Sequence, residues 1–207
     1  MEDRVIYGDA LKSMIHEMSE QYKRKNHDYG NSFDQSLDED GLIAAKVRIG
    51  DKVKRFCTLL DKESKVKDES IKDTLKDLAT YCLMSAKWYL NNGGYNEGQT
   101  MKSLFADLYG ACVDNKNYLY EIKMQGVYLS RARLLDSLDI LSKEIKKDDE
   151  ESSAVISTLF DMAKTAVLTS FYLNGTIVPK IRETSENQVP YSPLDELIKI
   201  LSNQSNK

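Results

Sequence analysis

The chain has 207 residues, of which 41% are hydrophobic and 30% are charged, a composition typical of a soluble globular protein rather than a disordered or membrane-spanning one. This length is enough to bury a hydrophobic core without a disulfide or a metal ion to stabilise it. The 29 basic and 33 acidic side chains give a net charge of −4. We therefore expect no binding to polymeric nucleic acid, because that activity needs a surplus of cations facing the phosphates.

Apolar residues recur every three or four positions along the first 178 residues, and all three prolines lie beyond them. This pattern predicts an all-α protein. We expect a bundle of about six to seven helices, near residues 9–25, 42–62, 69–91, 100–113, 118–146 and 152–173, with a short last helix opened by Pro193. The Asn- and Gly-rich run over 91–98 predicts a boundary. It separates a helical domain over 1–92 from a helical region over 99–207 that packs on it or forms an oligomer interface.

The amino-terminal residues and the cysteines favour a cytoplasmic protein. Two acids follow Met1, where a secretory signal has basic residues before an apolar run. No apolar stretch reaches the roughly 20 residues of a transmembrane helix. Cys57, Cys82 and Cys112 are odd in number and lack CxxC spacing, so we expect reduced thiols and no contact with a membrane.

Three carboxylates recur at four-residue intervals on the third predicted helix, at Glu69, Asp73 and Asp77. Like charges at this spacing repel, so the arrangement needs either solvent or a cation. Mg²⁺ suits it, since this ion takes carboxylate oxygens and keeps waters that a phosphate can replace. The alternative is a solvated face on which Ser70 and Asp73 form a capping box.

The same stripe continues toward the carboxyl end with Thr80, Met84 and Trp88, which are unusual on a purely solvated face. This helix is also apolar on nearly all sides between residues 81 and 90. Its second face is therefore expected to meet another helix or another subunit, and we expect at least a homodimer.

The first helix adds two carboxylates one turn apart, Glu17 and Glu20. If this flank faces the third helix, four acids converge there, enough to hold one or two Mg²⁺ ions. Taken alone, however, an ExxE pattern is common on exposed helices and then has no ligand role.

The second helix carries Arg48, Lys52 and Arg55 on one face, with Asp51 beside them. Such a cluster can bind nucleotide phosphates, with arginine in bidentate fashion and lysine as a point charge. The alternative is an ordinary basic face exposed to solvent.

The connection over 25–32 contains residues that disfavour helix, and Tyr29 presents a planar ring there. It is either an ordinary turn or a contact for a nucleobase and a phosphate, made by Lys25, Asn26, Asp28 and Tyr29. The acidic loop over 34–40 is expected to cover or rim that site. A nucleophilic triad, a GxGxxG motif and a P-loop are all missing from the sequence.

Three ordered blocks and Gly41 resemble the nucleotide-modification-associated domain family, small helical proteins found largely in phages and bacteria. The blocks are KNHDYGNS at 25–32, RIGDKVKR at 48–55 and DESIKDTLKDLATY at 68–81. The resemblance covers about residues 22–90. That domain is similar to the all-α nucleoside triphosphate pyrophosphohydrolases of the MazG and dimeric dUTPase group, in which acidic residues on neighbouring helices hold Mg²⁺. It implies a MazG-like core in the amino-terminal half and, for a phage protein, the cytoplasm of a bacterial host.

For individual residues, the resemblance implies that Glu69, Asp73 and Asp77 form the second acidic motif and that Glu17 and Glu20 form the first. All five would then be metal ligands, with Glu20 and Asp73 taking part in catalysis. The chain departs from the pyrophosphohydrolases in spacing its second motif by four residues instead of as ExxD.

Two main functions follow from these features. The first is a Mg²⁺-dependent enzyme that cleaves a nucleoside triphosphate or a modified deoxynucleotide between the α and β phosphates. In such an enzyme a carboxylate would act as the general base, and the Arg and Lys side chains of the second helix would bind the phosphates. The second is a non-catalytic binder that sequesters a nucleotide or a cyclic nucleotide signal, as phage anti-defence proteins do. A third, less specific possibility is a structural or regulatory oligomer that uses the carboxyl-terminal half for protein contacts.

Overall fold

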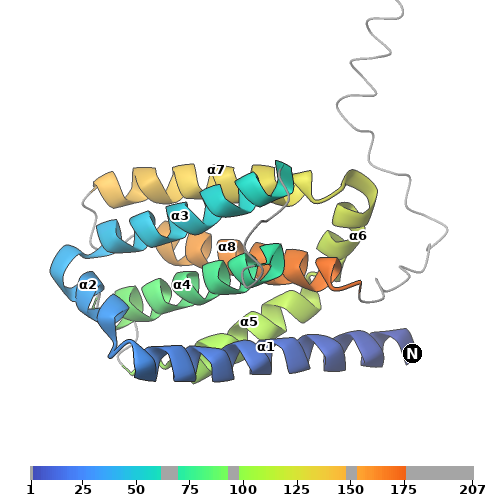
Figure 1. The fold of residues 1–207 in the computed structure, drawn as a ribbon, viewed down its shortest axis with the longest axis horizontal. Coiled ribbons are helices and arrows are strands. Elements are labelled where there is room, and N and C mark those ends of the chain that lie inside the picture. The colour runs from blue at the N-terminus through green and yellow to red at the C-terminus, as the bar shows by residue number, and fades with distance from the viewer. Residues whose placement is uncertain (1, 62–69, 93–97, 148–152, 176–207) are drawn as a thin grey trace, which may run out of the picture.

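The computed structural model describes residues 2–61, 70–92, 98–147 and 153–175, which form a helical bundle (Figure 1). Within these ranges there are eight α-helices and one short 3₁₀ helix, so the all-α prediction is confirmed and the number of helices is slightly higher than expected. They are α1 Glu2–Asp28, α2 Ser32–Asp40, α3 Leu42–Asp61, α4 Ile71–Asn92, α5 Met101–Asp114, α6 Lys116–Gln125, α7 Tyr128–Glu144, η1 Ile145–Lys147 and α8 Ser153–Leu173. The helix expected after Pro193 lies outside the described residues.

One additional helix is α2, in the acidic stretch that was expected to be a loop. Phe33 and Leu37 lie one turn apart on this helix and are both buried, which is enough to hold a short helix against α3 and α4. Asn31 before it and Gly41 after it have positive φ angles of 57° and 61°, so the chain turns at both ends of α2. Because acidic residues surround this apolar pair, the sequence pattern did not predict a helix here.

A second difference is the break in the helix expected over 118–146. Gly126 adopts a φ of 80°, a value that L side chains rarely take, and it separates α6 from α7. Its backbone N–H donates to the Ile122 carbonyl at 2.7 Å and closes the last turn of α6. The apolar spacing on the two sides is similar, which explains why the sequence pattern predicted one helix.

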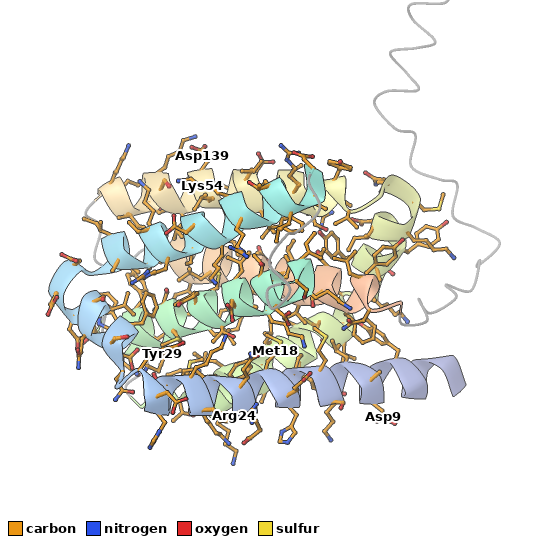
Figure 2. The ribbon with its side chains drawn as sticks, viewed as in Figure 1. Asp9, Met18, Arg24, Tyr29, Lys54 and Asp139 are labelled. Atoms are coloured by element: carbon orange, nitrogen blue, oxygen red, sulfur yellow. The ribbon has the colours of Figure 1, made fainter. Side chains whose placement is uncertain are left out.

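The first helix, α1, lies along one side of the bundle and turns its apolar residues inward (Figure 1). Leu11, Met14, Ile15 and Met18 are all buried. In Figure 2 the Met18 side chain points into the bundle, whereas the Arg24 side chain extends away from it. α1 packs mainly on α5, and the Tyr7 hydroxyl donates to the Cys112 carbonyl at 3.0 Å.

At the centre of the bundle, α4 packs most extensively on α8 and also contacts α3, α5 and α2. The five consecutive residues from Cys82 to Ala86 are all buried, which accounts for the apolar character of this helix on nearly all sides. The second face of α4 therefore meets helices of the same chain. The homodimer expected from that face stays a prediction.

The helices of the carboxyl-terminal half pack directly on those of the amino-terminal half, α5 on α1, α7 on α3 and α8 on α4. Their buried apolar residues form one continuous core cluster. Buried hydroxyls also join α6, α7 and α8, because Tyr118 and Thr169 each donate to Ser130 Oγ, at 2.9 and 2.8 Å.

Among the described residues, α8 alone is long and apolar enough to cross a bilayer. However, 67% of its most apolar window is buried inside the bundle. This burial favours a core helix of a globular protein over a membrane span.

We predict that Leu78→Ala, in the α4 core, lowers the free energy of unfolding by about 2–5 kcal/mol, because it removes a fully buried side chain and leaves a cavity. Urea denaturation followed by circular dichroism measures this change. The matched control is Leu135→Ala on α7, where the side chain is 41% exposed and the expected cost is below about 1 kcal/mol. Equal losses for the two variants would contradict the placement of α4 at the centre.

Candidate functional site

Two adjoining cavities lie between α1, α2, α3 and α4, with volumes of about 290 and 340 Å³. The first, here called the tyrosine side, is lined by Tyr22, Lys25, Asn26, Tyr29, Ser32, Phe33, Lys52, Asp77, Thr80, Tyr81 and Met84. The second, here called the arginine side, is lined by Arg48, Asp51, Lys52, Arg55 and Tyr81. Lys52 and Tyr81 line both cavities, so the two sides form one cleft.

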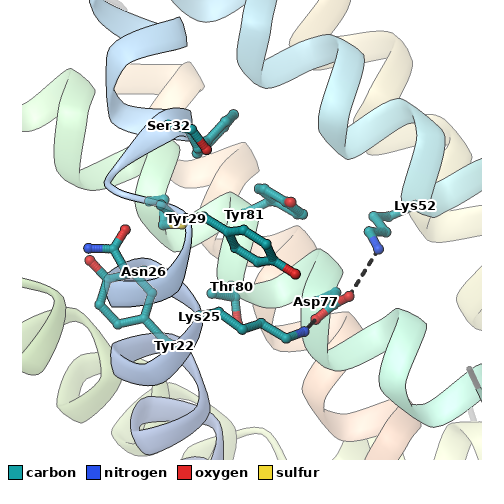
Figure 3. Close-up of a pocket in the computed structure, with 11 residues that line it drawn as sticks. Tyr22, Lys25, Asn26, Tyr29, Ser32, Lys52, Asp77, Thr80 and Tyr81 are labelled. Carbon is teal, nitrogen blue, oxygen red and sulfur yellow. Dashed lines mark hydrogen bonds and ion pairs between the residues drawn. The ribbon is translucent and has the colours of Figure 1, made fainter. Parts of the chain in front are cut away.

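On the tyrosine side, Tyr81 of α4 is held between a second ring and a cation. Phe33 meets it edge-on, with ring centroids 4.9 Å apart and an interplanar angle of 79°. Lys52 Nζ lies 5.9 Å from the centroid of the same ring. Tyr29 lines the same pocket, and Figure 3 shows its ring among the lining residues. Tyr29 is 68% exposed, so its ring is available for stacking on a planar ligand.

The turn that presents Tyr29 is formed by the two residues after it. Gly30 and Asn31 both adopt left-handed φ angles, of 58° and 57°, and end α1 abruptly. The Asn26 amide donates to the Asn31 side chain across this turn. The expectation of a helix-free connection from residue 25 is wrong, because α1 continues to Asp28 and places Lys25 and Asn26 on its last turn.

The centre of the cleft is an ion-pair network around Asp77 of α4. Lys25 Nζ of α1 donates to Asp77 Oδ1 at 2.8 Å, and Lys52 Nζ of α3 donates to Asp77 Oδ2 at 2.9 Å. Figure 3 shows the two lysines reaching the carboxylate from different sides. Burial by itself raises the pKa of Asp77, but the two lysines outweigh burial and hold the pKa below its usual value of 3.8. Asp77 is therefore ionised at neutral pH.

The arginine side is formed by one face of α3. Arg48, Lys52 and Arg55 follow each other at intervals of four and three residues, which places them along the same side of the helix. Asp51 lies among them. Together the two sides hold four basic and two acidic side chains, a net charge of +2 in a chain whose net charge is −4.

The predicted nucleotide contacts are brought together with one exception. Six of the seven line the cleft. The exception is Asp28, whose side chain is 73% exposed and lies 3.3 Å from the His27 ring. The six are Lys25, Asn26, Tyr29, Arg48, Lys52 and Arg55.

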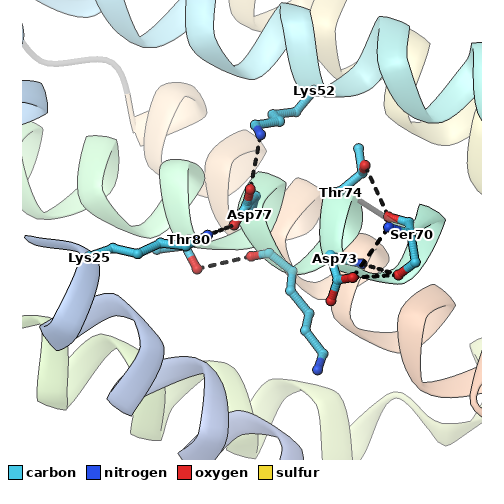
Figure 4. A network of polar contacts seen from close by, with 8 residues as sticks. Lys25, Lys52, Ser70, Asp73, Thr74, Asp77 and Thr80 are labelled. Carbon is cyan, nitrogen blue, oxygen red and sulfur yellow. Dashed lines mark hydrogen bonds and ion pairs between the residues drawn. The ribbon is translucent and has the colours of Figure 1, made fainter. Parts of the chain in front are cut away.

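The predicted metal ligands are not brought together within the described residues. Asp73 accepts from the Ser70 hydroxyl at 2.6 Å, and its N–H donates to Ser70 Oγ at 3.1 Å, so it completes the capping box of α4 (Figure 4). Glu17 pairs with Lys76 at 3.2 Å, and Glu20 pairs with a lysine on its own helix at 2.6 Å.

Of the four predicted ligands that the structure describes, Asp77 alone lies in the cleft, and both of its oxygens accept from lysines. Glu69 lies outside the described residues. No group of three His, Cys, Asp or Glu side chains in the described part of the chain is placed to share a metal ion. Of the described candidates, Asp73 and Asp77 are thus engaged by a helix cap and by lysines, whereas Mg²⁺ binds several oxygens directed at one point.

Several cleft residues were not singled out from the sequence as site residues, among them Tyr22, Ser32, Phe33 and Tyr81. The sequence did indicate that Thr80 and Met84 are not simply exposed to solvent, because they continue the acidic stripe and are unusual on a solvated surface. Both line the tyrosine side, which explains their position.

The fold and the cleft describe an all-α protein with a small, locally basic cleft that is also lined by aromatic rings. A family model described as Nucleotide modification associated domain 1 matches residues 25–86 of this chain. The match confirms the family resemblance over that range, and the range contains every cleft residue except Tyr22. Searches of curated proteins and of solved structures found no match.

We predict that Asp77→Asn lowers the free energy of unfolding at pH 7 by about 1–2 kcal/mol, because the charge that both lysines face is removed and only one of the two acceptor oxygens remains, in a partly exposed position. Since the folded-state pKa of Asp77 is lowered, its stabilisation is fully present above the unfolded pKa of about 3.9 and is lost as pH falls through the folded value. Urea denaturation between pH 7 and pH 2.5 should show a constant difference from the wild type down to about pH 5 and a narrowing difference below about pH 4. A pH-independent difference would contradict the ion-pair assignment.

Proposed function

We propose that this protein binds a nucleotide in the cleft, with the base on the tyrosine side and the phosphate groups on the arginine side. The observation that carries this proposal is the junction of the two cavities at Lys52 and Tyr81. It places aromatic rings and a cluster of cations within reach of one small molecule. Rings suit a nucleobase, and Arg and Lys suit phosphate oxygens.

The dimensions of the cleft agree with this ligand class. Cavities of about 290 and 340 Å³ that adjoin are comparable to ordinary small-molecule sites. The cleft also combines apolar surface from Phe33 and Met84 with a few polar groups, as such sites usually do. The description of the matching family, which mentions nucleotide modification, supports the same class of ligand.

The described side chains favour a protein that binds a nucleotide without hydrolysing it in a metal-dependent reaction. Their carboxylates are engaged in a helix cap and in pairs with lysines, and they do not converge on one point. Such a binder would act by sequestering a nucleotide or a cyclic nucleotide signal. The Mg²⁺-dependent pyrophosphohydrolase is the alternative function, and the MazG-like core, the homodimer and the phage or bacterial cytoplasmic setting stay predictions.

Arg48→Gln tests the phosphate position. We predict at least a ~10-fold loss of affinity for the tightest ligand in a panel of nucleoside mono-, di- and triphosphates and cyclic nucleotides, because a charge-assisted phosphate contact is lost. Isothermal titration calorimetry measures the affinities. Arg24→Gln is the matched control, since Arg24 is also exposed but extends from α1 away from the bundle (Figure 2). Equal effects of the two substitutions would contradict the proposed phosphate position.

Hydrolysis is tested by incubating the wild-type protein with the four common ribonucleoside triphosphates and the four common deoxyribonucleoside triphosphates. We predict that each is recovered intact by ion-exchange chromatography, with or without Mg²⁺, because no trio of described carboxylates is placed to hold the ion. Accumulation of monophosphate and pyrophosphate that requires Mg²⁺ and disappears in Asp73→Asn would contradict this prediction and establish the hydrolase.

A further inference from the structure

Asp77 pairs with two lysines of the cleft, and the role inferred for it below rests on the proposed nucleotide site. Its two carboxylate oxygens accept from ammonium groups of different helices, Lys25 of α1 at 2.8 Å and Lys52 of α3 at 2.9 Å. Both lysines line the tyrosine side, and Lys52 also lines the arginine side. The carboxylate therefore neutralises cations at the point where the two sides of the cleft meet.

The charge of the cleft depends directly on this side chain. With Asp77 ionised, the lining has four basic and two acidic side chains and a net charge of +2. The Asp77 carboxylate keeps its charge at neutral pH because its pKa is lowered by the two lysines, despite the opposing effect of burial. Replacing it with a neutral group of the same size would raise the net charge of the cleft to +3.

We propose that Asp77 is a specificity-determining residue that limits the negative charge of the ligand. As an internal anion shared by Lys25 and Lys52, it matches the cleft to a ligand that carries about two negative charges, as a phosphomonoester does at pH 7. Each further phosphate on a metal-free nucleotide meets the same carboxylate and is repelled by it at short range. The cleft therefore prefers nucleoside monophosphates, or nucleotides with two phosphodiester groups, over free triphosphates.

A purely structural role for Asp77 makes a different prediction. If its carboxylate only ties α1 and α3 to α4, its replacement changes the shape or rigidity of the cleft and alters the affinity for mono-, di- and triphosphates of one nucleoside in the same proportion. An electrostatic role changes these affinities in proportion to ligand charge. The ratio of the triphosphate affinity to the monophosphate affinity separates the two roles.

The experiment titrates AMP, ADP and ATP, and the corresponding guanosine, cytidine and uridine nucleotides, into the wild type and Asp77→Asn. EDTA removes divalent cations, and the ionic strength is held constant because these interactions are screened by salt. We expect the ratio of triphosphate to monophosphate affinity to rise by about tenfold or more in Asp77→Asn. Asp139→Asn, on the outer side of α7 (Figure 2), removes the same charge far from the cleft and should leave the ratio unchanged.

Lys25→Gln changes the charge of the cleft in the opposite direction, and it provides the test of the affinity ratio if Asp77→Asn does not fold. It lowers the net charge of the cleft to +1, so the ratio should fall. An unchanged ratio in folded Asp77→Asn, or a shift of the same sign in both variants, would overturn the proposal while nucleotide binding stands. If no nucleotide binds to the wild type or to either variant, the nucleotide site itself is refuted, and the role of Asp77 is refuted with it.

Discussion

The arrangement of the cleft depends on one carboxylate, that of Asp77, which joins three helices that are distant in the sequence. It connects α4 to α1 through Lys25 and to α3 through Lys52. Its side chain is 27% exposed, so the ion pairs are less screened than pairs on an open surface, yet a ligand can still reach the lysines. The same side chain therefore ties the three helices together and, under the proposed role, also sets the charge that is available for binding.

Asp77 can position these lysines because the opposite face of α4 is fixed in the core. Leu75, Leu78 and Cys82 are fully buried, and α4 packs along α8 for most of its length. The residues that face the cleft, Asp77 and Tyr81, lie one turn apart on the other side of the same helix. A rigid helix of this kind keeps the carboxylate and the ring at a constant separation, so the two sides of the cleft keep their relative positions.

The sequence predicted the helical class and most helix positions because buried helices repeat their apolar residues with a period of 3.6. It missed α2, where the pair Phe33 and Leu37 is too short a pattern to detect among acids. For the site, spacing correctly grouped the basic residues of α3. Spacing could not show what each carboxylate faces, because a stripe defines one face of a helix but not its neighbours. Asp73 thus caps a helix, whereas Asp77, one turn further along, meets two lysines.

The contrast between the local and the overall charge gives a physical reason for selecting a small ligand over a polymer. The cleft lining has a net charge of +2, whereas the whole chain has −4. A long polyanion would place many phosphates near the acidic remainder of the surface, within the Debye length of about 10 Å at 0.1 M salt. A single nucleotide bound as proposed would meet mainly the cations of the cleft, where the surrounding low-dielectric walls strengthen the attraction. Under the proposed function, the excess of acidic residues outside the cleft would disfavour nucleic acids while leaving the attraction to one nucleotide largely intact, so that specificity would come from repulsion of the wrong ligand.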